Sequence, residues 1–199
     1  MKKIIISLAL ILFSLNANAM DKETVEKFVD RIGNDIIDIA KEKNISEEKK
    51  REKIISVIDS VIDAEWIARF VLAKNYNNIT EKQRERFTKL YRDFMINTYG
   101  PKFKKYNGKK FTVTDVTEQR SFYIAKAEFV PHDSNVVISV NFRVKERGSK
   151  LVILDFIAEG VSLIETQRSE FNSAISQNGI EKFLDDLELR IKNLKKLKA

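Results

Sequence analysis

Few residues of this 199-residue chain have the types and spacing that catalysis requires. Asp155 and Glu159 lie four positions apart where an apolar run ends, and two such carboxyls could act as a general acid and a general base. A structural interpretation needs fewer assumptions. In it, Asp155 binds nearby backbone or arginine groups, and Glu159 caps or pairs at the bend that Gly160 permits.

Metal and cofactor chemistry has little support in the sequence. His132 is the single histidine, and the chain contains no cysteine. A zinc site needs several nitrogen or sulfur ligands, and His132 lies in a Pro-His-Asp turn, where we expect it to be solvated. No glycine-rich phosphate loop is present. We therefore expect no metal, no cofactor and no enzymatic activity.

The first nineteen residues have the pattern of a secretory signal peptide. Lys2 and Lys3 precede an apolar stretch over residues 4–15, and Ala17-Asn18-Ala19 fits a cleavage site. The apolar stretch is shorter than the roughly 20 residues that span a bilayer. We expect cleavage after Ala19 and export to the periplasm, with residues 20–199 forming a single domain. Without cysteines, packing alone must hold this domain together.

The charge of the chain is positive but modest. The formal net charge is +7, and removing the two leader lysines from it leaves +5. This surplus favours anionic surfaces or acidic partners. It is a weak signal for nucleic acid, and export weakens it further, so no nucleic-acid partner is expected. We expect the protein to be a monomer.

Apolar residues at helical spacing predict helices at both ends of the exported chain. The expected helices cover roughly residues 25–39, 46–62, 63–71, 80–98, 163–177 and 180–197. Local signals mark several of their ends: Asp63 as an N-cap, Thr80 with Gln83 as a capping box, and Gly179 after a C-terminus. The helices therefore flank a central region of another type.

That central region predicts four strands, over residues 110–116, 122–130, 136–144 and 151–158. The third strand alternates most clearly, with apolar side chains at every second position from Val136 to Val144. Short connections favour antiparallel pairing. We expect an α+β fold, in which a curved four-stranded antiparallel sheet is wrapped by helices and encloses an apolar cavity.

Four motifs in order carry a resemblance to a known family. They are the Asp-Ala-Glu-Trp-Ile-Ala-Arg-Phe-Val-Leu run at 63–72, the Gln-Arg-Glu-Arg-Phe start at 83–87, the Asp-Phe-Ile-Ala-Glu-Gly-Val-Ser-Leu run at 155–163, and Gly-Ile at 179–180 followed by Phe183 and Leu184. At this spacing, behind a signal peptide, they resemble the MlaC (toluene-tolerance) family of periplasmic phospholipid-binding proteins. Ala73 departs from the glycine that is usual in the family, and Tyr76 from a frequent tryptophan.

The resemblance implies a function that composition does not show. It implies a soluble carrier with phospholipid as cargo, which moves lipid between an outer-membrane lipoprotein complex and an inner-membrane ABC transporter. Such transport maintains the lipid asymmetry of the outer membrane. Two alternatives stay open: an exported enzyme on a similar cone-like fold, and a periplasmic adaptor without a ligand.

The resemblance also assigns the apolar rows to a cavity, although the same rows could form an ordinary packed core. The expected helical wall consists of Ile67, Phe70, Val71, Phe87, Leu90, Tyr91 and Phe94. The expected strand wall consists of Tyr123, Ala125, Ala127, Phe129, Ile138, Val140, Phe142 and Val161. Arg168 is expected at the mouth, near the lipid headgroup.

Overall fold

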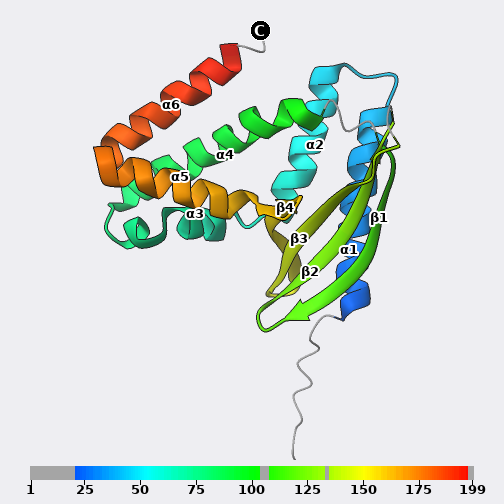
Figure 1. Ribbon diagram of the computed structural model, residues 1–199. Coiled ribbons are helices and arrows are strands. Elements are labelled where there is room, and N and C mark those ends of the chain that lie inside the picture. Colours follow the sequence, from blue (N-terminus) through cyan, green and yellow to red (C-terminus); the bar gives the residue numbers. More distant parts are fainter. Residues whose placement is uncertain (1–20, 104–107, 133–134, 197–199) are drawn as a thin grey trace, which may run out of the picture.

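The structure is a computed structural model that describes residues 21–103, 108–132 and 135–196. The expected signal peptide lies outside these residues. The described chain forms two lobes, a sheet lobe and a helical lobe (Figure 1). Each helix within the described ranges is too short or too polar to cross a bilayer.

Most helices begin and end at the residues whose chemistry predicted those positions. Asp63 Oδ1 accepts from the N–H of Trp66 at 2.9 Å, and Thr80 and Gln83 exchange both bonds of a capping box, at 2.8 and 3.3 Å. The helices are α1 (Lys22–Lys41), α2 (Glu47–Val61), α3 (Ala64–Leu72), α4 (Glu81–Phe103), α5 (Leu163–Asn178) and α6 (Ile180–Lys196), with a 3-10 turn, η1 (Ala73–Asn77), after α3.

The sheet has five antiparallel strands in chain order, so the expectation of four was wrong by one short strand. Glu159 and Gly160 both have positive φ, 53° and 79°, and form a two-residue turn that returns the chain for two more pairs. The strands are β1 (Gly108–Gln119), β2 (Phe122–Pro131), β3 (Ile138–Arg147), β4 (Lys150–Ala158) and β5 (Val161–Ser162).

Irregular pairing accompanies the curvature of the sheet that Figure 1 shows. The register of β1 against β2 shifts between Val113 and Asp115, and that of β3 against β4 shifts between Arg143 and Val144. A register shift of this kind is typical of a β-bulge, in which one extra residue bends the strand and increases its twist. Val136, which was expected to open the third strand, instead precedes it and is 66% exposed.

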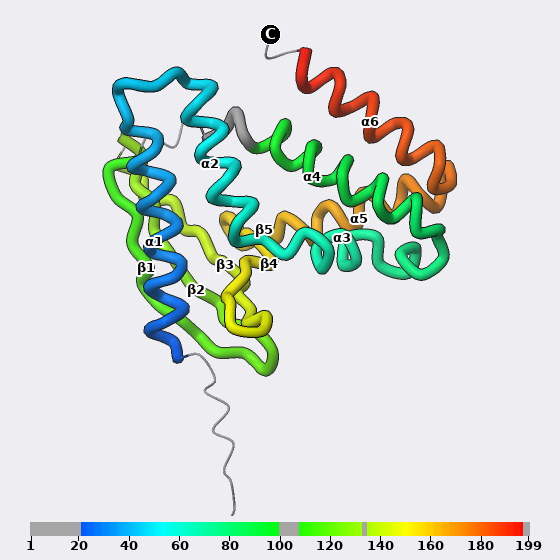
Figure 2. The backbone as a smooth tube through the Cα atoms, turned by 180° about the vertical axis from the view of Figure 1, so that it is seen from behind, coloured from blue at the N-terminus to red at the C-terminus, as the bar shows by residue number. Residues whose placement is uncertain are grey.

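The sheet lobe is built on α1, which lies along one face of the sheet (Figures 1 and 2). Val25, Val29 and Ile37 of α1 are buried against the inner side chains of β1, β2 and β3. A glycine permits this close approach, because a Cβ at Gly33 would stand 2.2 Å from the Phe111 ring. The helix and the sheet therefore share one dry core.

The helical lobe has a separate core, which α3, α4, α5 and α6 enclose. Phe171 of α5 lies at its centre and makes edge contacts with Phe87 and Phe94 of α4, at centroid distances of 6.2 and 5.7 Å. Buried Tyr91 donates its hydroxyl hydrogen to Gln167 of α5. Burial raises the pKa of Tyr91 well above its ordinary value, so this phenol stays protonated.

The two lobes meet at the junction of α2 with α3 and at the corner where β4 passes through β5 into α5. At the junction, Ile62 forms a parallel bridge with Ile153 of β4, and Asp63 pairs with Arg147 at 3.0 Å. At the corner, the Ser162 hydroxyl donates to Asp155 at 2.7 Å. These contacts fasten the helical lobe to β4.

Candidate functional site

A group of half-buried apolar side chains separates α2 from the inner face of the sheet. We call it the half-buried cluster. Phe28 and Phe142 are at its centre, because both contact the core under α1 and the smaller core between α1, α2 and β4. The half-buried cluster consists of Phe28, Ile36, Val57, Ile138, Phe142, Phe156 and Ala158. Large apolar side chains that converge without becoming fully buried are a candidate apolar ligand site.

Strand register determines the wall that the sheet contributes. Phe142 of β3 pairs with Phe156 of β4, and the rings meet edge to face with centroids 5.5 Å apart. Phe111 of β1 contacts Phe142 in the same way at 6.0 Å. Val140 of β3 pairs with Ala158 of β4. The small side chain of Ala158 leaves space on the sheet surface beside the Phe156 ring. The result is an aromatic row that crosses three strands.

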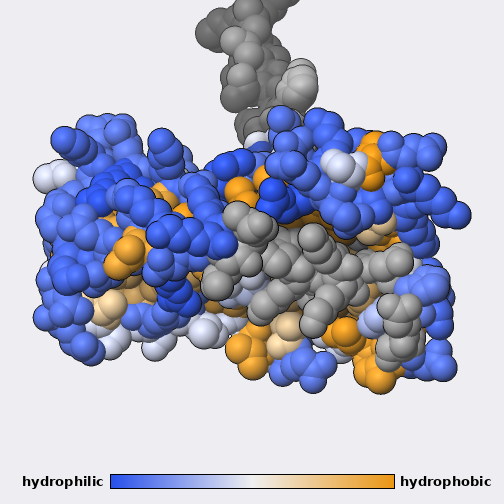
Figure 3. Space-filling view, turned by 90° about the horizontal axis from the view of Figure 1, so that it is seen from above, coloured by the Kyte–Doolittle hydropathy of each residue, from blue (hydrophilic) through white to orange (hydrophobic). Residues whose placement is uncertain are grey.

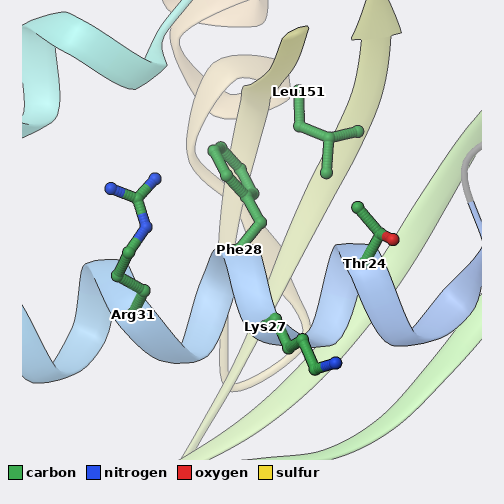
Figure 4. Close-up of a pocket in the computed structure, with 5 residues that line it drawn as sticks. All are labelled: Thr24, Lys27, Phe28, Arg31 and Leu151. Carbon is green, nitrogen blue, oxygen red and sulfur yellow. The ribbon is translucent and has the colours of Figure 1, made fainter.

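A shallow hollow of about 320 Å³ lies at the Phe28 end of this cluster. Figure 4 shows Thr24, Phe28 and Arg31 extending from α1 on the side of Leu151, the second residue of β4. The spacing of four and three residues places them on one helix face. The floor is therefore apolar, and Arg31 and Lys27 put positive charge at its rim. About 300 Å³ is the lower end of ordinary ligand pockets.

The expected helical wall does not join this cluster. Ile67, Val71, Phe87, Tyr91 and Phe94 are buried in the core of the helical lobe, and Phe70 and Leu90 pack against it half-buried. The stripe of α4 therefore faces the other helices rather than the sheet. Its assignment to a ligand stays a prediction.

The expected strand wall divides between two environments. Tyr123, Ala125, Ala127, Phe129 and Val140 are buried beneath α1, and the two alanines are 0% and 1% exposed. The space beside these alanines is filled by the helix. By contrast, Ile138 and Phe142 belong to the half-buried cluster. Val161 lies on β5 and is 61% exposed.

Arg168 is found on the surface of α5, away from the half-buried cluster. Its guanidinium carbon lies 4.7 Å from the centroid of the Phe70 ring. A second hollow, of about 380 Å³, is lined by Ala73, Lys74, Arg168, Ser169 and Asn172. The nearby Glu165 pairs with Arg143 at 3.4 Å.

The acid at position 155 is structural, as its sequence context indicated. Asp155 is buried and accepts hydrogen bonds from the Ser162 hydroxyl at 2.7 Å and the Ile164 N–H at 3.3 Å. Arg143 lies 3.9 Å away. Burial raises the pKa of this carboxyl, although each of these contacts lowers it. Asp155 is therefore positioned to hold the start of α5 and is closed to a substrate.

Sequence reasoning missed Phe28, Ile36, Val57, Phe156 and Ala158 as candidate site residues. All five lie in elements that were predicted correctly, so their apolar character was visible. What was missing was the pairing of Phe142 with Phe156 and the placement of α2 beside Phe142. Seen from above, both lobes present mainly hydrophilic side chains, with hydrophobic ones in scattered places (Figure 3).

This architecture, an α+β sheet lobe joined to an all-helical lobe, has known relatives. A sequence profile described as MlaC protein matches residues 27–189, most of the chain. The chain therefore belongs to the MlaC family. The fold also matches a phospholipid-binding protein from Ralstonia solanacearum, solved in complex with a phospholipid, with a TM-score of 0.69 at 18% identity. That match covers 87% of this chain and 98% of the other.

A curated relative agrees with this assignment. The toluene tolerance protein Ttg2D of Pseudomonas putida is 21% identical over 132 residues. The matched part covers 65% of this chain and 61% of the length of that relative. At these identities the structural match establishes the fold, and the family match establishes the kinship.

Proposed function

We propose that this protein is an exported, periplasmic carrier that binds phospholipid and moves it between an outer-membrane lipoprotein complex and an inner-membrane ABC transporter. The single observation that supports it most is membership in the MlaC family over residues 27–189. The shared fold with a protein that was solved holding a phospholipid adds to this support.

The energetics of such a carrier require an apolar site that communicates with membranes. A two-chain lipid has about 30 methylenes, and each contributes ~0.8 kcal/mol on leaving water, roughly 24 kcal/mol in total. Release into water is therefore too slow to be useful. Transfer to another apolar environment recovers the same free energy, so exchange can be nearly balanced.

We propose the half-buried cluster as the place where the acyl chains bind. Its walls carry apolar carbon from Phe28, Phe142 and Phe156, and they avoid the cost of about 1–3 kcal/mol for each unpaired polar atom in a dry site. The hollow between Phe28 and Leu151 gives these side chains an edge that is open to solvent. Chains that enter there would separate α2 from β3 and β4.

A substitution that fills the cluster tests this proposal. We expect Ala158→Trp to reduce the phospholipid that copurifies with the protein from about one per chain to less than about a third, because the indole occupies space beside Phe156. Organic extraction followed by mass spectrometry measures the lipid. A cooperative thermal transition shows that the variant still folds.

The matched control is Leu189→Trp, which places the same side chain at a position on α6 that is 56% exposed. This variant should retain the lipid content of the wild type. If the wild-type protein carries no phospholipid, the carrier function is wrong. If Ala158→Trp retains it fully, the acyl chains bind elsewhere.

A further inference from the structure

One surface of the helical lobe combines positive charge with aromatic rings. It is formed by α3, η1 and the adjoining side of α5, which lie next to each other in Figures 1 and 2, together with Arg84 in the first turn of α4. Glu65 is the acidic residue of α3. We call this surface the basic-aromatic face; it comprises Trp66, Arg69, Phe70, Lys74, Tyr76, Arg84 and Arg168.

Ring stacking holds the arginines of this face. The guanidinium carbons of Arg69 and Arg84 each lie 5.2 Å from the centroid of Tyr76, and Arg168 is stacked on Phe70. Phe70 is stacked in turn on Trp66, at 5.2 Å. Stacking covers the flat side of a guanidinium and leaves its in-plane N–H groups available to an oxyanion.

The charges of this face are not neutralised within the described part of the chain. There, no carboxylate forms an ion pair with Arg69, Lys74 or Arg168. Arg84 donates instead to the backbone carbonyls of Tyr76 and Ile79, both at 3.0 Å, and keeps its charge.

The side of the same lobe where α4 meets α6 differs. Arg86 of α4 lies within 3.5 Å of Glu181, 2.7 Å of Asp185 and 3.0 Å of Glu188. Arg190 of α6 pairs with Glu170 at 2.6 Å. The cations of the basic-aromatic face therefore contrast with the paired arginines Arg86 and Arg190 of the same lobe.

The second hollow gives this face a place for one anionic group. The side chain of Asn172 is already hydrogen-bonded within the protein. Its Nδ2 donates to the Val71 carbonyl at 2.8 Å, and its Oδ1 accepts from Asn75 at 2.7 Å. Lys74, Arg168 and the Ser169 hydroxyl remain around a space of about 380 Å³. Two cations and a hydroxyl are suitable donors for a phosphodiester.

We propose that the basic-aromatic face binds the anionic headgroups of a lipid bilayer surface, with one phosphodiester between Lys74 and Arg168. A protein partner would be expected to bury an apolar anchor in a desolvated centre. The large apolar residues that are well exposed in the described chain are Val136, Val137, Val161 and Leu189, and none belongs to α3, η1 or α5. Half-buried rings among basic side chains match the interfacial zone of a membrane instead.

This attachment is weak and reversible, because each basic residue near an anionic surface contributes only a few-fold to binding. It acts whether or not the protein carries cargo. The test is cosedimentation with vesicles of phosphatidylcholine that contain about 30% phosphatidylglycerol, compared with pure phosphatidylcholine. The wild-type protein should bind the anionic vesicles, and binding should weaken as salt increases.

Neutralising the hollow should abolish most of this binding. For Lys74→Gln/Arg168→Gln we expect an association constant that is lower by about 30-fold. Lys41→Gln/Lys196→Gln removes the same charge from the last turns of α1 and α6, away from α3 in Figure 1. That control should change binding by less than about threefold. Extracted cargo lipid, measured alongside, should be equal in all three proteins.

Two results would overturn the proposal: unchanged vesicle binding by Lys74→Gln/Arg168→Gln, or equal binding of the wild type to neutral and anionic vesicles. If that variant keeps vesicle binding but loses association with an acidic protein, the face belongs to a protein partner. A wild-type protein that carries no phospholipid but binds anionic vesicles would contradict the carrier function and leave this inference standing.

Discussion

Ala73 has a backbone conformation that suits its side chain poorly. It follows α3 directly, with φ 51° and ψ −126°, and its N–H reaches the carbonyl of Arg69. A Cβ is strained in this region, which glycine enters freely. The resemblance to the MlaC family marks this position as one where glycine is usual. The protein therefore forms the tight turn between α3 and η1 with a strained backbone at Ala73.

Replacing this alanine should stabilise the protein. We expect Ala73→Gly to raise the free energy of unfolding by about 1 kcal/mol, since relief of about 1–3 kcal/mol of strain exceeds the 0.4–1 kcal/mol of added freedom in the unfolded chain. The melting temperature should rise by about 2–4 °C. Urea and thermal unfolding measure both quantities.

The control for this substitution is Ala174→Gly, in the interior of α5. There the backbone is helical, so glycine should destabilise by about 0.5–1 kcal/mol or more. A loss of stability at position 73 similar to that at 174 would show that Ala73 is unstrained.

The corner between β4, β5 and α5 shows how one buried acid can organise several elements. Asp155 lies on β4, Ser162 ends β5, and Ile164 is in the first turn of α5. The carboxylate accepts from both of the latter residues. It therefore supports the helix N-terminus, where negative charge is favourable, and fixes the direction in which α5 leaves the sheet.

This corner should respond to pH in a defined direction. Burial raises the pKa of Asp155 above its ordinary value of 3.8, so folding favours the protonated acid. Its contribution to stability is greatest below pH 3.8 and declines as pH rises through the folded pKa. An NMR titration of the Asp155 carboxyl carbon should therefore give a midpoint above 3.8.

The variant Asp155→Asn supplies the comparison, because it has no carboxyl to titrate at this site. The free energy of unfolding of the wild type minus that of the variant should fall as pH rises through the Asp155 midpoint. A midpoint below 3.8 would mean that the hydrogen bonds from Ser162 and Ile164 outweigh burial.

Element by element, local chemistry explains what the sequence could predict. The capping box of Thr80 and Gln83 and the N-cap at Asp63 act within a few residues, and both were visible in advance. The strand β5 was missed, because two residues cannot display an alternating pattern. Periodicity also predicts an apolar face without identifying what covers it. For that reason the stripe of Phe87, Tyr91 and Phe94 was expected against the sheet and is found against α5 and α6.

At the scale of the whole molecule, α2 is the element that connects the two lobes and covers the half-buried cluster. Val57 and Val61 of α2 contact the small core that includes Ile153. Its far side pairs with the helical lobe through Asp59 and Arg92. If acyl chains enter between α2 and the sheet, as we propose, the C-terminal end of α2 must be able to move relative to β4.

Linking that end of α2 to β4 tests this expectation. Ile62, which follows α2, forms an isolated parallel bridge with Ile153 of β4, and backbones paired in this way lie about 4.8 Å apart, within the range that a disulfide spans. The chain has no native cysteine, so the only disulfide that Ile62→Cys/Ile153→Cys can form within one chain is the intended bond. We expect the oxidised variant to exchange phospholipid with vesicles at least about tenfold more slowly than the wild type, because the site opens less often.

The reduced form of the same variant is the matched control, since both forms have lost the same isoleucine contacts. Reduction should restore the exchange rate, measured by transfer of a fluorescent phospholipid. Lipid already bound before oxidation should remain bound, because the disulfide blocks the path and leaves the half-buried cluster unchanged. Equal rates in the oxidised and reduced forms would place the moving part elsewhere. The corner of Asp155 and Ser162 is another connection at which the lobes could separate.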